Sequence, residues 1–172
     1  MKTARFCFLL ILAHATAFAQ QPTSNESLVK LAANLDKLTR VTEQRISLRA
    51  AFSDLCAPVD LPDHARLVGR PDIGIHIYVT PTSAATFKDA GSRFPVGTVI
   101  LKQKFPTVNA KDADFYTGML KREEGFNPAC GDWEFFTMTG DRRAVTARGR
   151  IESCIDCHRQ YAKTDFITKR IK

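Results

Sequence analysis

Apolar residues recur with two different periods along this chain, and the change of period divides it. In residues 24–55 they return every three or four positions, which is typical of one face of a helix. Thr23 and Glu26 resemble a capping box at its start, and Pro58 prevents the helix from continuing. The pattern predicts one long N-terminal helix, or two helices with a break near Thr42.

After Pro62 apolar residues alternate with polar ones instead, which is typical of half-buried β-strands. The predicted strands cover residues 73–80, 97–105, 115–121 and 133–139. A short helix is predicted from Pro81 to about Ala90, because Thr80 is placed as its N-cap. Another short helix begins near Ile151. The expected fold class is α+β, a mainly antiparallel sheet with a long N-terminal helix and a short C-terminal helix.

The first 19 residues have the order of a secretory signal peptide. Lys2 and Arg5 precede an apolar stretch, and Ala17-Phe18-Ala19 is a small-x-small cleavage pattern. The apolar stretch is too short to span a bilayer, which needs about 20 residues. We therefore expect a signal peptide over residues 1–19 and a mature periplasmic protein, beginning near Gln20, without a membrane span.

Length and charge limit the possible partners. The chain has 172 residues and a formal net charge of +7, which falls by two when Lys2 and Arg5 leave with the signal. The mature length fits one domain. The basic residues of the C-terminal tail are not interleaved with aromatic residues at a regular spacing, so we expect no nucleic-acid partner.

Near the C-terminus, Cys154-Ile155-Asp156-Cys157-His158 reads C-x-x-C-H, the attachment motif for a c-type haem. Two thiols at this spacing can add to the two vinyl groups of one porphyrin, and the following histidine becomes an axial iron ligand. The alternatives are a redox-active thiol pair or half of a zinc site, but a second pair of zinc ligands at similar spacing is missing. The motif predicts one covalently attached haem c bound by Cys154, Cys157 and His158.

Two further cysteines are left over in the mature chain. Of five cysteines, Cys7 lies in the signal peptide and two belong to the haem motif, which leaves Cys56 and Cys130. In an oxidising compartment such a pair most often forms a disulfide. We therefore predict a Cys56–Cys130 disulfide, with two buried free thiols as the alternative.

Several segments together resemble one family. They are residues 77–81, 94–102 and 131–136, followed by residues 154–166 around the haem motif. These segments resemble, in the same order, the cytochrome P-460 family, which also contains cytochrome c'-beta. The resemblance implies a haem domain over residues 63–172, while the helical segment 20–62 that precedes it lies outside the resemblance. It also implies a homodimer, and a five-coordinate iron with His158 on one side and an open distal site.

The resemblance implies two activities, which differ at one lysine. Proteins of the P-460 type oxidise hydroxylamine and carry a bond from a lysine to the porphyrin edge, and the matching position is Lys102. Relatives of the c'-beta type lack this bond and bind nitric oxide. Strand alternation places Lys102 on one face with Ile100 and Lys104, so an ordinary solvent-facing lysine is the alternative.

Three functional hypotheses follow from the occupancy of the sixth iron position. Hydroxylamine oxidation, with a periplasmic electron acceptor, is expected first, and nitric-oxide binding without catalysis is the alternative. A plain electron carrier would need a second strong iron ligand. The mature candidates for that ligand are Met119, Met138, His64 and His76.

Overall fold

The computed structural model describes residues 24–48, 72–89 and 91–167. Within them, seven strands form one antiparallel sheet in the order β1-β3-β4-β5-β6-β7, and β2 also pairs with β3. The strands are β1 (Thr39–Arg40), β2 (Ile46–Leu48), β3 (Ile73–Val79), β4 (Val99–Phe105), β5 (Phe115–Lys121), β6 (Trp133–Thr139) and β7 (Val145–Gly149). The fold class is α+β, as expected.

The helices lie at the two ends of the described chain and after β3. They are α1 (Asn25–Ala33), α3 (Ala84–Lys88) and α4 (Glu152–His158), with the 3-10 turns η1 (Leu35–Lys37), η3 (Pro81–Ser83), η4 (Pro128–Cys130) and η5 (Arg159–Thr164). None of the helices within the described ranges is long and apolar enough to cross a membrane.

The predicted strands from β3 to β6 are confirmed, and β5 and β6 have the predicted ends. The sequence interpretation missed β7. Only Val145 and Ala147 are apolar in this five-residue strand, so its alternation is too short to stand out. Its partner β6 decides its structure, because the two strands pair from Phe135↔Gly149 to Met138↔Val145.

The prediction of a long N-terminal helix is wrong. Helix α1 ends at Ala33, where the Asn34 side chain donates a 2.7 Å hydrogen bond to the carbonyl of Lys30. The chain then becomes extended, and β1 and β2 pair with the two ends of β3. The buried Thr42 hydroxyl joins this edge by accepting a hydrogen bond from the Ile77 amide. β-Branched residues and an open sheet edge therefore outweigh helical spacing here, while residues 49–55 of the predicted helix lie outside the described part.

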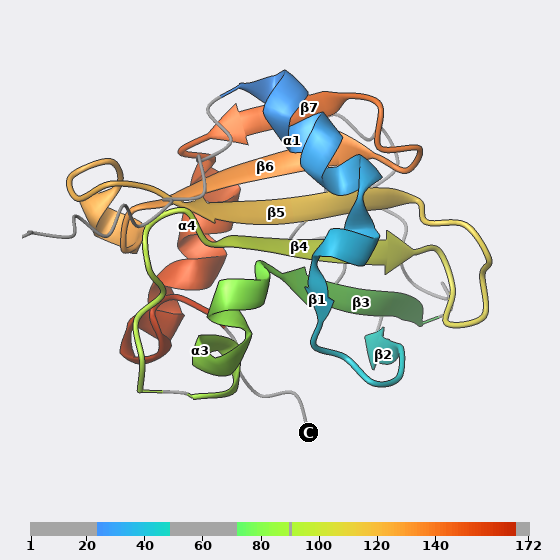
Figure 1. Ribbon diagram of the computed structural model, residues 1–172, viewed down its shortest axis with the longest axis horizontal. Helices are drawn as coiled ribbons and strands as arrows, with labels where there is room; N and C mark the ends of the chain where they lie inside the picture. The colour runs from blue at the N-terminus through green and yellow to red at the C-terminus, as the bar shows by residue number, and fades with distance from the viewer. Residues whose placement is uncertain (1–23, 49–71, 90, 168–172) are drawn as a thin grey trace, which may run out of the picture.

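The sheet is buried on both faces. On the first, which we call the α1 face, Leu28 and Ala32 of α1 pack on side chains of β4, β5 and β6. On the other, the α4 face, Ile155 of α4 and Phe87 of α3 pack on Ile100, Met119, Phe135 and other residues. Figure 1 shows α1 crossing the near side of the sheet and α4 passing behind it. Alternate residues of one strand therefore serve two separate cores.

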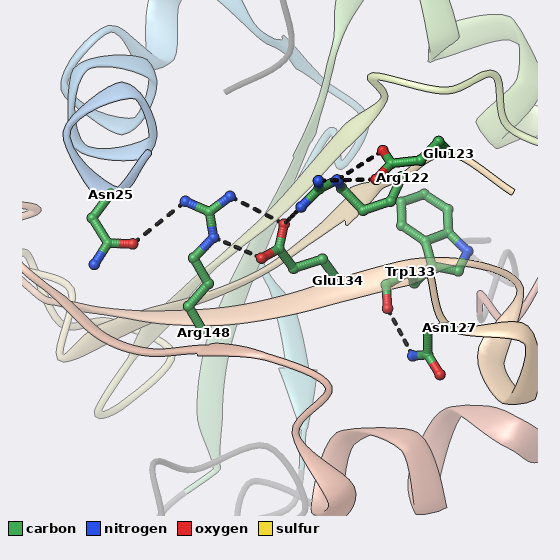
Figure 2. Close-up of polar contacts among 7 residues, drawn as sticks. All are labelled: Asn25, Arg122, Glu123, Asn127, Trp133, Glu134 and Arg148. Atoms are coloured by element: carbon green, nitrogen blue, oxygen red, sulfur yellow. Dashed lines mark hydrogen bonds and ion pairs between the residues drawn. The ribbon is translucent and has the colours of Figure 1, made fainter. Parts of the chain in front are cut away.

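A buried carboxylate ties α1 to the edge of the sheet. Glu134 of β6 accepts hydrogen bonds from Arg122 at 2.7 Å and from Arg148 of β7 at 2.8 and 3.0 Å. Arg148 also reaches the side chain of Asn25, at the start of α1, at 3.4 Å. Figure 2 shows the Glu134 carboxylate between the two guanidinium groups. This network lies on the α1 face.

Replacing Leu28 with alanine tests how α1 is held. Leu28 is 1% exposed and packs on the sheet, so the Leu28→Ala variant should lose about 2–5 kcal/mol of unfolding free energy. The exposed Lys30 provides the control, and Lys30→Ala should change stability by less than about 0.5 kcal/mol. Equal losses in the two variants, measured by chemical denaturation, would contradict the packing of α1 on this face.

The Glu134 network should make stability dependent on pH. Burial alone would raise the pKa of Glu134, but hydrogen bonds and charges from Arg148 and Arg122 outweigh it and hold the pKa below its usual value. Because the pKa is lowered in the folded protein, the stabilisation is present above the unfolded pKa and is lost as the pH falls through the folded pKa. Glu134→Gln should destabilise the protein by about 3 kcal/mol at neutral pH.

The difference between the wild type and Glu134→Gln should shrink as the pH falls through the acidic range. Urea titrations across that range measure it. The control is Glu123→Gln, because Glu123 also pairs with Arg122 but its side chain is 60% exposed. This variant should show no measurable loss at any pH, and a stability difference for Glu134→Gln that does not vary with pH would contradict the pKa direction.

Candidate functional site

The C-x-x-C-H motif lies on α4, so the helix predicted near Ile151 is confirmed. Cys154 and Cys157 are three residues apart, which places both thiols on the same side of the helix. Ile155 faces the sheet and is buried, and Cys154 packs against the same core. The helix therefore holds Cys154 at the α4 face, with the half-buried Cys157 one turn further along.

His158, the last residue of α4, has a fixed orientation. Its Nδ1 atom lies 2.7 Å from the backbone oxygen of Phe166, and its ring centroid lies 5.3 Å from that of Phe135. A carbonyl oxygen can only accept, so Nδ1 must carry the proton and donate it. Nε2 then carries the lone pair that can bind a metal, and the hydrogen bond at Nδ1 makes the imidazole a stronger donor.

A buried ion pair holds the segment that supplies this carbonyl. Lys121, at the end of β5, contacts both carboxylate oxygens of Asp165 at 2.8 and 2.9 Å. The same carboxylate accepts a 2.8 Å hydrogen bond from the Phe94 amide, and the backbone oxygen of Asp165 accepts one of 2.9 Å from the Trp133 indole. Three separate segments therefore fix Asp165, the residue before Phe166.

The backbone of Asp165 and Phe166 needs this support. Both residues have positive φ angles, 53° and 63°, a conformation that non-glycine residues rarely adopt and that costs of order 1 kcal/mol or more each. Gly131 makes room for the turn, because a Cβ atom there would lie 2.5 Å from the Phe166 ring. Three of the segments that resemble the family in sequence, residues 94–102, 131–136 and 154–166, meet at this place.

Sequence reasoning did not single out Lys121, Asp165 or Trp133 as site residues. Lys121 ends an apolar strand, where a charged residue is ordinarily solvated, and only its pairing with Trp133 in the sheet brings it under the last turn. The only signal in the sequence is that Lys121 lies two residues after the buried Met119, and therefore on the same face of the strand.

The two lysines of β4 both belong to the α4 face. Lys102 is half-buried and lies between Ile77 of β3 and Thr117 of β5 in the sheet. Lys104 is only 2% exposed, and its ammonium lies 4.5 Å from the ring centroid of Phe115. The alternative of two solvent-facing lysines therefore does not describe Lys104.

The candidates for a second iron ligand are separated by the sheet. Met119 lies on the α4 face, whereas Met138 packs in the core of the α1 face. His76 is bonded through Nδ1 to the Thr42 hydroxyl at 3.0 Å, and its pKa is lowered by burial and by the charges of Arg40 and Arg45. His64 lies outside the described residues. Of the described candidates, only Met119 shares the face of His158.

Cys130 sits in the core beside α4. It is fully buried with a free thiol, and burial, with a smaller contribution from Cys154, raises its pKa to about 11. No disulfide joins the described cysteines. Its predicted partner Cys56 lies outside the described residues, so the Cys56–Cys130 bond stays a prediction.

Comparison with known proteins assigns the chain to a class. The model of the cytochrome P460 family matches residues 72–169, which is more than half of the chain and includes the sheet from β3 to β7 and the whole C-x-x-C-H motif. The chain therefore belongs to the cytochrome P460 family, and membership implies a haem cofactor. A search of the curated proteins found no match.

The residues at α4 fit a haem. Two thiols lie on one side of a helical turn, and a histidine with a fixed tautomer follows the second thiol directly. Apolar side chains of the same face, including Ile100, Met119 and Phe135, surround this position. This donor set and these apolar surroundings are compatible with a haem.

Alkylation distinguishes the two states of Cys130. In the folded holoprotein near pH 8 its buried thiol should not react with iodoacetamide, because the thiolate is disfavoured by burial. In urea without reductant, mass analysis should show no alkylation if the predicted disulfide is present. Alkylation of both Cys56 and Cys130 under these conditions would rule the disulfide out.

Proposed function

We propose that this protein carries one covalently attached haem c and acts on small nitrogen oxides in the periplasm, with hydroxylamine oxidation as its activity. The observation that supports this most is the environment of His158. His158 directly follows the second of two correctly spaced thiols, and its Nδ1 is held by the Phe166 carbonyl. This arrangement suits an axial iron ligand.

Each residue of the motif has a separate task. Cys154 and Cys157 would form the thioether links that keep the haem on α4, while His158 would bind the iron through Nε2. The haem, when bound, supplies the redox-active iron and an open coordination position for a small ligand. Phe135 contacts the His158 ring and limits its rotation, so the ligand direction is fixed before any substrate arrives.

Lys102 is the residue on which the enzymatic hypothesis depends. It lies on the α4 face, one row of the sheet away from Ile100, Met119 and Phe135. A half-buried lysine beside an apolar surface can keep its stem on that surface. This position suits the proposed bond from Lys102 to the porphyrin edge.

Nitric-oxide binding is the second candidate, and one observation favours it. The row formed by Ile100, Met119 and Phe135 is apolar, whereas hydroxylamine oxidation needs a group that accepts protons. The acidic residues nearest in sequence are Glu123, Glu124 and Asp132. Glu123 pairs with Arg122, Glu124 is exposed, and Asp132 accepts a hydrogen bond from the Asn127 amide. An apolar row of this kind suits reversible binding of a diatomic ligand.

The remaining parts of the proposal concern the surroundings of the protein. The signal peptide over residues 1–19 lies outside the described residues, as does much of the N-terminal segment 20–62. Export, a homodimer and a periplasmic electron acceptor are proposed from the sequence and from family membership. The mild basic charge suits an acidic redox partner.

The optical spectrum of the dithionite-reduced holoprotein, made with a c-type maturation system, tests the two functions. We expect a Soret band shifted far to the red, and loss of this shift in Lys102→Met with the haem still attached. Lys104→Met is the matched control, because Lys104 shares the face but is not the residue proposed to form the bond. A wild-type spectrum of the ordinary high-spin c-type would remove the bond and favour nitric-oxide binding.

A second pair of variants in the same experiment tests the iron ligand. His158→Ala should retain covalent haem, by mass, but change its spin state, whereas His76→Ala on the opposite face should leave the spectrum unchanged. An unchanged spectrum in His158→Ala would show that His158 is not the ligand. A low-spin, six-coordinate wild type would favour an electron carrier instead.

A further inference from the structure

We propose that the buried Lys121–Asp165 ion pair is a positioning device for the axial histidine, acting through the Phe166 carbonyl. This inference rests on the proposed function, since it requires a haem bound by His158. It assigns to two residues outside the C-x-x-C-H motif a role in setting how strongly the protein holds the iron.

The pair is built to be immobile. The side chains of Lys121 and Asp165 are 10% and 2% exposed, and both carboxylate oxygens accept from the ammonium. One of them also accepts from the Phe94 amide. Separating the pair would leave a buried charge without a partner, which costs several kcal/mol. The end of β5 and the turn that follows η5 therefore cannot move apart independently.

Because Phe166 follows Asp165 directly, fixing Asp165 also restricts the backbone of Phe166. The Phe166 amide donates a 2.8 Å hydrogen bond to the Tyr161 carbonyl, and its ring lies against Gly131. On the other side, the Thr164 hydroxyl donates to the Ile167 carbonyl at 2.6 Å. Because the flanking groups are fixed, the Phe166 oxygen has little freedom except to face His158.

The consequence for the iron follows from the hydrogen bond at Nδ1. A firm Nδ1–H···O=C bond raises the donor strength of the imidazole at Nε2, and a weak one lowers it. If the ion pair is lost, the strained backbone at Asp165 and Phe166 can relax and the carbonyl can turn away. His158 should then bind iron more weakly and be displaced more easily by a ligand on the opposite side.

The experiment uses holoprotein variants Asp165→Asn and Lys121→Met, with Lys121→Arg as the conservative variant that keeps the charge. Resonance Raman spectra of the ferrous form measure the iron–histidine stretching band. Both disruptive variants should shift this band to lower frequency and increase the five-coordinate share of the nitric-oxide adduct, and Lys121→Arg should restore most of both.

The matched control is Glu134→Gln, which breaks a buried ion pair on the opposite face of the sheet (Figure 2). It should lower stability without moving the iron–histidine band. The midpoint potential of the haem in each variant distinguishes an effect on the position of His158 from a purely electrostatic effect. The two disruptive variants change the local charge with opposite signs, so a purely electrostatic effect would move their potentials in opposite directions and leave the band unchanged.

An unchanged band in folded, haem-loaded Asp165→Asn or Lys121→Met would overturn the proposal, as would an equal shift in Glu134→Gln. A wild-type band at the low frequency of a histidine without an Nδ1 hydrogen bond would overturn it even if no variant folds. Failure of the proposed function looks different, because the wild type would then lack covalent haem by mass or show a six-coordinate iron.

Discussion

A lysine and an aspartate that meet inside the protein determine the geometry of the candidate site. Burial makes the contact between Lys121 and Asp165 hard to break, since either charge alone would be strongly disfavoured there. The contact joins the end of a central strand to the turn after the last helix. It also supports two consecutive residues with positive φ, so the backbone that faces His158 is held in a conformation it would not adopt alone.

The two faces of the sheet have different roles, stability on the α1 face and the candidate site on the α4 face. On the α1 face, Glu134 and its two arginines tie β6, β7, the residue after β5 and the first helix together. On the α4 face, the same strands present the apolar row that receives the haem-motif helix. Because side chains alternate along each strand, a residue such as Phe135 can serve the site while its neighbour Glu134 serves stability.

The sequence pattern predicted those elements whose structure is determined by residues close together in the chain. The central strands and α4 followed from alternation and from the C-x-x-C-H spacing, because each is specified by residues close together in sequence. For the N-terminal segment, the prediction from the sequence pattern was wrong. Its apolar spacing fits a helix, but residues after Asn34 gain more by pairing with the open edge of β3, a partner far along the chain.

The same limit applies to the site. The motif named the cysteines and the histidine, but nothing near Lys121 in sequence indicates that its charge is buried under Asp165, 44 residues later. Such a contact exists only once β5, β6 and the last turn are in place, so it depends on the fold as a whole. A residue that orients an iron ligand through a backbone carbonyl needs no special residue type at the carbonyl itself. This is why Phe166, whose oxygen contacts His158, is invisible to any search for metal-binding side chains.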